Sequence, residues 1–126
     1  MAKKYIVGDW VKFLFEESKV IEVYEDGSYY MDSPNITGCT KEEELSPIPL
    51  TPEILEKNGW RTQNRWYYYL DVAEGFISYI GIDFKHKSNK GHLYVEVDRN
   101  NMVEIQYCHE LQHFLFGIGI NYEMEV

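Results

Sequence analysis

The sequence predicts an α+β fold with two groups of antiparallel strands and two short helices. Its 126 residues are 44% hydrophobic and 16% aromatic, which is enough apolar surface to bury a core in a chain of one domain's length. Short β-prone runs lie on both sides of a helix-like segment at 51–59, and a second such segment follows at 107–117. We therefore expect residues 1–50 to form a small β-barrel-like subdomain. Residues 51–126 are expected to form a helix, an antiparallel sheet and a C-terminal helix, with a single compact unit as the alternative.

The first half of the chain is expected to fold as an antiparallel meander. Asp26-Gly27 suits a tight hairpin, because Gly adopts the positive φ that such turns need. Pro34 and Gly38 bracket a looser return toward Cys39. Four or five strands of this length are predicted to curl into an SH3-like barrel, with Gly8-Asp9-Trp10-Val11 at the entrance to the first strand. The expected strands are Trp10–Phe15, Val20–Tyr24 and Ser28–Met31.

The connecting helix is marked at both ends. Thr51 can cap its N-terminus, Pro52 takes the first helical position, and Gly59 supplies a left-handed stop. Residues 46–50 precede it with two prolines, each of which fixes its own φ and keeps its predecessor out of the α region. A rigid connector is therefore expected ahead of a short helix.

The second half returns to strands and closes with a helix. Met102–Ile105 is expected to add a short strand before a helix that begins near Tyr107 and stops at Gly117, and Gly119 leads to a brief terminal strand or tail. The helix is expected to pack its apolar stripe on the second sheet, with its two histidines on the opposite, solvated face. The earlier strands are expected at Trp66–Leu70, Phe76–Phe84 and His92–Val97, and the stripe consists of Tyr107, Cys108, Leu111, Phe114, Leu115 and Ile118.

The charge of the chain limits its partners. Lys and Arg number 12 against 21 Asp and Glu, which gives a net charge of −9 and disfavours nucleic acid and anionic membrane surfaces. No apolar run approaches the roughly 20 residues of a membrane span, and the first residues lack the apolar segment of a secretory signal. Cys39 and Cys108 are expected to be reduced thiols. These features predict a cytoplasmic protein.

One motif carries a recognisable chemistry. His109 and His113, one helical turn apart, could bind Zn²⁺ with Glu110 as the general base of a hydrolase. Catalytic zinc needs a third protein ligand and an open position for water. No spacing supplies that ligand: the upstream candidates Cys39, His86 and His92 are not required to approach, and Glu123 and Glu125 lie in the tail. We therefore predict no catalytic, cofactor or metal residues, with the zinc hydrolase as the alternative.

Two further clusters have simple structural explanations. Lys85, Lys87 and Lys90 form a basic patch that is expected to be a solvated turn, with nucleic-acid binding as the alternative. Along Trp66-Tyr67-Tyr68-Tyr69 every second ring of a strand faces the core, and the outward rings are expected to form a protein-contact surface.

Three stretches of the sequence resemble one family of uncharacterised small proteins from gut anaerobic bacteria and their prophages or other mobile elements. They are Gly8–Val11, Leu45–Trp60 and Tyr107–His113, and the most specific part is Pro-Ile-Pro-Leu-Thr-Pro-Glu-Ile-Leu-Glu-Lys-Asn-Gly at 47–59. The likeness spans nearly the whole chain. In that family the position of His113 is often Asn, so the resemblance implies that the zinc pair is dispensable and that Leu111-Gln112 matters for helix packing. It implies an accessory role and carries no activity.

The sequence therefore favours a cytosolic protein–protein interaction module of mobile-element origin. The expected partner is another protein, and the oligomeric state is open. The alternative is a small zinc-dependent hydrolase that uses His109, Glu110 and His113.

Overall fold

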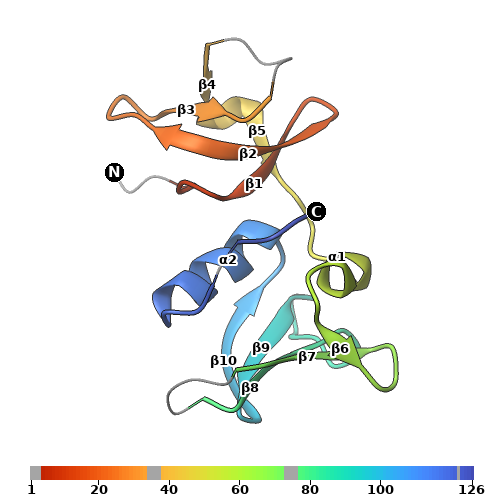
Figure 1. Cartoon of the computed structure of the whole chain (residues 1–126). Helices are drawn as coiled ribbons and strands as arrows, with labels where there is room; N and C mark the ends of the chain where they lie inside the picture. The colour runs from red at the N-terminus through yellow and green to blue at the C-terminus, as the bar shows by residue number, and fades with distance from the viewer. Residues whose placement is uncertain (1–3, 34–37, 73–76, 122) are drawn as a thin grey trace. The chain divides into compact units, whose positions relative to one another are not determined.

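The computed structural model describes residues 4–33, 38–72, 77–121 and 123–126 and divides the chain into two compact units. The first unit comprises Met1–Pro49 and Tyr107–Val126, and the second comprises Leu50–Gln106. Each unit contains one five-stranded antiparallel sheet (Figure 1), so the fold is α+β as the sequence predicts. The division after Pro49 lies close to the predicted boundary, but the C-terminal helix is grouped with the first sheet instead of the second.

The sheet of the first unit is a curled half-barrel in the order β4-β3-β2-β1-β5 (Figure 1). Gly27 has a φ of +88° in the turn between β2 and β3, where a tight hairpin was predicted. Pro34, expected to open the return toward Cys39, lies outside the described residues. The strands are β1 (Trp10–Phe13), β2 (Glu16–Val23), β3 (Ser28–Met31), β4 (Cys39–Lys41) and β5 (Leu45–Pro47), with a short 3-10 helix η1 (Glu42–Glu44) before β5.

Two features of this sheet differ from the prediction. Strand β1 ends at Phe13 because Leu14, with a φ of +55°, turns the chain so that Phe13 pairs with Glu16. The proline-containing segment that was expected to be only a connector supplies β5, whose Pro47 lies opposite Val11 at the edge of the sheet. The buried core of the sheet consists of Tyr5, Val11, Val20, Tyr29, Met31 and Leu45.

The second unit begins with helix α1 (Pro52–Lys57). The Thr51 hydroxyl accepts a hydrogen bond from the Ile54 amide at 3.3 Å, and Gly59 follows the helix with a φ of +84°. Its sheet has the order β10-β9-β8-β7-β6. The two-residue strand β6 (Arg61–Thr62) gave no sequence signal, whereas the other strands lie within or close to the predicted segments. They are β7 (Tyr67–Asp71), β8 (Tyr79–Asp83), β9 (Leu93–Val97) and β10 (Asn100–Ile105).

The two faces of the second sheet have different roles. Register pairs Tyr68 with Ile82 and Ile82 with Val95, and all three are buried on one face. The Tyr68 hydroxyl donates to Glu56 Oε1 of α1 at 2.9 Å. Tyr67 and Tyr69 lie on the opposite face, because successive side chains of a strand alternate. The predicted alternation of rings along this run is confirmed.

Helix α2 (Cys108–Gly117) begins where the sequence predicts it and packs in the first unit, where it contacts β1. Cys108, Leu111 and Leu115 of the predicted stripe are buried, whereas Ile118 lies beyond the helix and is exposed. Cys39 and Cys108 are free thiols. Among the described residues, no helix is long and apolar enough to cross a membrane.

Candidate functional site

A buried glutamine joins α2 to the loop that enters β1. Gln112 is fully buried; its Oε1 accepts from the Trp10 amide at 3.0 Å, and its Nε2 donates to the Gly8 carbonyl at 2.8 Å. The glutamine amide thus satisfies one backbone donor and one backbone acceptor that lie about a hundred residues earlier in the chain. Leu111 is fully buried too. Both residues that the resemblance singled out are therefore packed in the helix interface.

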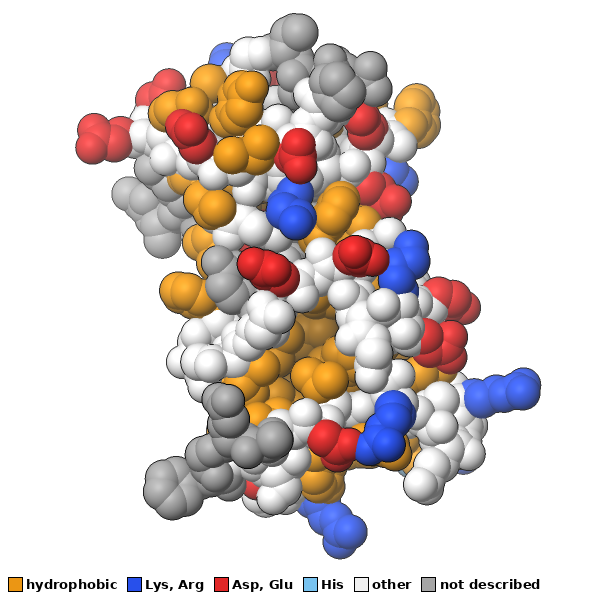
Figure 2. Space-filling view, viewed as in Figure 1, with side chains coloured by type: hydrophobic (Ala, Val, Ile, Leu, Met, Phe, Trp, Pro, Cys, Tyr) orange, Lys and Arg blue, Asp and Glu red, His pale blue; other side chains and the backbone are white. Residues whose placement is uncertain are grey.

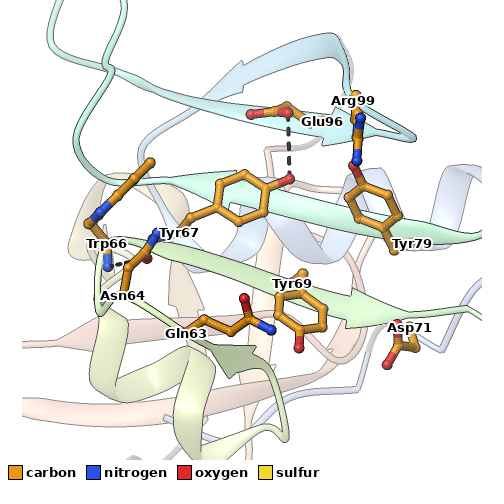
Figure 3. A pocket seen from close by; sticks show the side chains of 9 residues that line it. All are labelled: Gln63, Asn64, Trp66, Tyr67, Tyr69, Asp71, Tyr79, Glu96 and Arg99. Atoms are coloured by element: carbon orange, nitrogen blue, oxygen red, sulfur yellow. Dashed lines mark hydrogen bonds between the residues drawn. The ribbon is translucent and has the colours of Figure 1, made fainter.

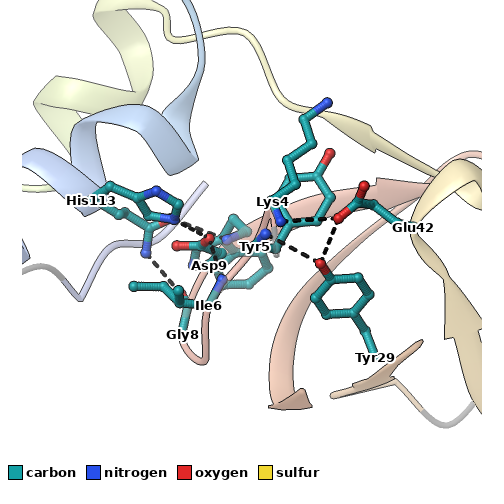
Figure 4. A network of polar contacts seen from close by, with 10 residues as sticks. Lys4, Tyr5, Ile6, Gly8, Asp9, Tyr29, Glu42 and His113 are labelled. Atoms are coloured by element: carbon teal, nitrogen blue, oxygen red, sulfur yellow. Dashed lines mark hydrogen bonds and ion pairs between the residues drawn. The ribbon is translucent and has the colours of Figure 1, made fainter. Parts of the chain in front are cut away.

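The next residue of α2 binds the middle of the same loop. Asp9 is fully buried, and its Oδ2 lies 2.6 Å from His113 Nε2 and accepts from the Ile6 amide at 2.8 Å (Figure 4). The His113 side chain is 34% exposed. The bond fixes its ring against the loop instead of leaving it free in solvent.

His109 is enclosed by aromatic rings. Its side chain is 5% exposed, with the Tyr5 ring centroid 5.0 Å away in an edge-on arrangement and the Tyr107 ring stacked at 6.0 Å. Burial is the largest influence on the pKa of His109 and lowers it. The charge of Asp9 raises the pKa and that of His113 lowers it, and the net shift is downward. The imidazole is therefore neutral near pH 7.

The prediction that both histidines lie on a solvated helix face is wrong. The N-terminal segment from Tyr5 to Trp10 covers that face, and Asp9 pairs with His113 within it. Glu110, the general base of the alternative zinc-hydrolase interpretation, accepts from the Tyr107 amide at 3.0 Å and so serves as a helix N-terminal cap. Each of the three motif residues has a structural contact in the fold.

A polar network extends from this loop to the 3-10 helix of the first unit. Glu42 Oε1 accepts from the Tyr29 hydroxyl at 2.8 Å and from the Lys4 amide at 3.0 Å (Figure 4). Burial, with a smaller contribution from the Glu42 charge, raises the pKa of Tyr5 to about 12. Three buried polar atoms in the described part of the chain have no protein partner, namely Tyr5 Oη, Asp9 Oδ1 and His109 Nδ1.

The described residues contain no group of three or more His, Cys, Asp or Glu side chains arranged to hold a metal ion. Asp9 is the carboxylate next to the histidine pair, and the sequence gave no indication of it. Of the upstream candidates, His86 Nδ1 lies 2.9 Å from Asp83 Oδ2 within the second unit, and Cys39 is exposed on β4.

A second candidate site is a hollow of about 620 Å³ on the open face of the second sheet. Its aromatic rings come from β7, from β8 and from the turn before β7, and one carboxylate comes from β9 (Figure 3). All of its lining belongs to the second unit. The lining residues are Gln63, Asn64, Trp66, Tyr67, Tyr69, Asp71, Tyr79, Glu96 and Arg99.

Tyr67 lies across β8 because position 81 is glycine. A Cβ at Gly81 would overlap Tyr67 Oη and Cζ, so a larger residue at this position would have to displace the Tyr67 ring. The Tyr67 hydroxyl reaches Glu96 Oε1 on β9 at 3.5 Å (Figure 3). Burial, and then the Asp83 charge, raise the pKa of Glu96, and burial and the Glu96 charge raise the pKa of Tyr67.

The turn between β9 and β10 brings Arg99 to the hollow. Asp98 and Arg99 have φ values of +49° and +74°. The left-handed turn is secured because Asp98 Oδ1 accepts from the Ser78 and Tyr79 amides at 3.0 and 3.1 Å. This fixes the start of β8 and the Arg99 side of the hollow together.

Two cations of the chain already lie on rings of the hollow. The Arg61 guanidinium is 5.2 Å from the Tyr69 ring centroid and forms an ion pair with Asp71. Lys85 Nζ lies 5.4 Å from the Trp66 ring centroid. Lys85 was assigned to a solvated turn on sequence grounds, and the structure adds this contact. These rings have the geometry in which aromatic faces attract cations.

The sequence indicated only part of this site. The outward rings of the Trp66–Tyr69 run were singled out, but Tyr79, Glu96 and Arg99 were not. Tyr79 and Glu96 come from β8 and β9, where alternation along the strand is the signal that assigns them to the open face, and Arg99 comes from the turn after β9.

Comparison of the chain with models of known protein families, with curated proteins and with solved structures gives no match. The resemblance described from the sequence therefore stays an expectation.

The buried state of His109 predicts a loss of stability in acid. Because the pKa of His109 is lowered in the folded chain, the unfolded chain binds more protons below about pH 6.5, and stability falls as the pH falls through that range. We expect the urea midpoint of the wild type to drop between about pH 7.5 and pH 5. The drop should be smaller in His109→Phe than in the wild type, and in the control His92→Gln it should equal that of the wild type. A full drop in His109→Phe would contradict this assignment.

Proposed function

We propose that the chain is a cytoplasmic protein–protein interaction module whose hollow on the second sheet binds a segment of a partner protein. The observation that carries this proposal is the hollow itself, in which four aromatic rings lie beside a half-buried carboxylate on a sheet face. Trp and Tyr are enriched at protein interfaces because a large apolar ring and a polar tip are buried together at small entropic cost. Gly81 makes room for the Tyr67 ring, which keeps this surface in place.

The first unit fits the same proposal as a scaffold. We assign its curled sheet to the SH3-like class of small barrels, and we include the accessory, mobile-element role that the sequence resemblance implies. Hydrophobic side chains stand among acidic ones on the face of this unit seen in Figure 2, and Ile21, Tyr24 and Tyr30 are among its exposed hydrophobic residues. A net charge of −9 steers such a protein toward basic partners.

Capture from a lysate of the cells that naturally express the chain tests the proposal. The bait is compared with a double variant, Tyr69→Ser with Tyr79→Ser, which removes two rings of the hollow. We expect the wild type to retain a partner that the double variant loses by roughly tenfold or more, because buried aromatic residues dominate interface energies. The matched control Tyr30→Ser removes an exposed tyrosine of the first unit and should retain the partner.

Two results would overturn the proposal. One is a lysate from which only the chain itself is recovered. The other is a captured protein whose recovery is the same with the double variant, provided that the circular dichroism spectrum shows the variant to be folded.

The second candidate function is the zinc-dependent hydrolase, and one observation favours it. Asp9 Oδ2 lies 2.6 Å from His113 Nε2, and the buried Asp9 Oδ1 has no protein partner, so Asp9 is the residue nearest to the role of a third ligand, although no group of three ligands among the described residues is arranged to hold a metal. In the geometry described, His113 Nε2 is occupied by Asp9 and Glu110 caps the helix. Zinc binding would require His113 to exchange its partner, and Glu110 to turn toward the metal.

Metal analysis separates the two candidates. The chain is purified without chelator and without a nickel-affinity tag, and its zinc content is measured for the wild type, His113→Ala and the control His86→Ala. The interaction proposal expects a folded chain with no stoichiometric zinc. Zinc near one equivalent that is lost in His113→Ala and retained in His86→Ala would instead support the hydrolase.

A further inference from the structure

We propose that the hollow of the second sheet binds a positively charged side chain, arginine or lysine, of its protein partner, with Glu96 as the counter-ion. This inference rests on the proposed function and names the chemistry that the hollow recognises.

The first support is that Glu96 pairs with no cation among the residues that the structure describes. Its side chain is half-buried, and within the described part of the chain it forms no ion pair. Glu96 Oε1 accepts a hydrogen bond from the Tyr67 hydroxyl, a neutral donor, at 3.5 Å. The raised pKa of Glu96 has the same origin, since burial and the nearby charge of Asp83 both disfavour the carboxylate. A bound cation would offset this cost.

The other charged residues near Glu96 do not neutralise its carboxylate. Asp83 is buried on β8, two residues beyond the Gly81 that pairs with Glu96; it accepts from the Lys85 and His86 amides and lies 2.9 Å from His86 Nδ1. Asp71 is paired with Arg61. Glu96 is thus the carboxylate lining the hollow that lacks an ionic partner among the described residues.

The second support is the arrangement of the rings. Arg61 and Lys85 lie over the Tyr69 and Trp66 rings, which shows that two rings of the site accept cations in this fold. The rings of Tyr67 and Tyr79 have no cation within the described residues, and both lie on the face that Glu96 shares. An aromatic face is attractive to a guanidinium or ammonium group, most of all where water is partly excluded. Glu96 and these two rings together match one cationic group.

Arg99 acts against a bound cation, and this makes the proposal testable against other ligands. Arg99 is exposed and lines the same hollow, so its charge opposes a bound cation while leaving room for the Glu96 carboxylate to attract it. A glycan, which would also suit aromatic rings and amide groups, would gain hydrogen bonds from Arg99 instead. Removing the Arg99 charge should therefore strengthen the binding of a cationic side chain and weaken the binding of a glycan.

The test titrates the whole chain with small probes and follows the amide of Glu96 and the indole N–H of Trp66 by NMR. The cationic probes are Nα-acetyl-arginine amide and Nα-acetyl-lysine amide, and the neutral controls are Nα-acetyl-glutamine amide and maltose. We expect the cationic probes to bind with a Kd of about a millimolar, as suits a single side chain. The affinity should fall as salt rises, and the neutral controls should cause no shift.

Matched variants assign the contacts. Glu96→Gln should weaken the cationic probes by about tenfold, and Arg99→Gln should strengthen them by a few-fold because a like charge is removed. Gly81→Ala should weaken them by displacing the Tyr67 ring. The control Glu104→Gln removes an exposed carboxylate of β10 and should leave the affinity unchanged. Dispersed amide spectra establish that each variant is folded.

The outcomes separate the inference from the proposed function. Cationic probes that leave the spectra of the folded wild type unchanged overturn the inference, as does binding of maltose that Arg99→Gln weakens. If this occurs while lysate capture still depends on Tyr69 and Tyr79, the interaction function stands with a different ligand chemistry. Binding that follows the expected order of variants supports the inference whatever the identity of the partner.

Discussion

Two adjacent residues of helix α2 hold the loop that enters β1, and the first unit is organised around these contacts. Gln112 binds the backbone on both sides of Asp9, and His113 binds the Asp9 side chain itself. Strand β1 lies between β2 and β5, and at its partly buried entrance the Trp10 amide and the Gly8 carbonyl find their partner in the buried side chain of Gln112. A buried backbone group without a partner costs about 1–3 kcal/mol. The side chain of Gln112 removes two such costs at once.

These contacts change the interpretation of the HExxH motif. In a zinc hydrolase the two histidines and the glutamate converge on a metal and a water molecule. Here His109 is packed among tyrosine rings, Glu110 caps the helix, and His113 pairs with a buried aspartate. The same spacing of one helical turn that would let two imidazoles share an ion instead presents them to one loop. The spacing of a motif therefore indicates which side chains share a helix face. What those side chains do depends on the segment that packs against that face.

The features that the sequence predicted correctly are those that depend on residues close together in the chain. Thr51, Pro52 and Gly59 mark helix α1 because capping, a fixed φ and a left-handed residue act within a few positions of the chain. The Asp26-Gly27 hairpin and the alternation of Tyr67, Tyr68 and Tyr69 are local in the same sense. The sequence could not show which sheet α2 joins, because that depends on Gln112 and His113 meeting Gly8, Asp9 and Trp10. The sequence pointed to the hollow only through its tyrosine run, since Glu96 reaches it by strand pairing and Arg99 by the turn between β9 and β10.

The hydrogen-exchange rate of the Trp10 backbone amide is the most direct test of this account. The amide donates to Gln112 Oε1, so its protection depends on a side chain of α2. We expect slow exchange in the wild type and fast exchange in Gln112→Ala, while the amide of Ile80 in the second sheet stays protected in both. An equally protected Trp10 amide in a folded Gln112→Ala chain would contradict the claim that this helix holds the loop.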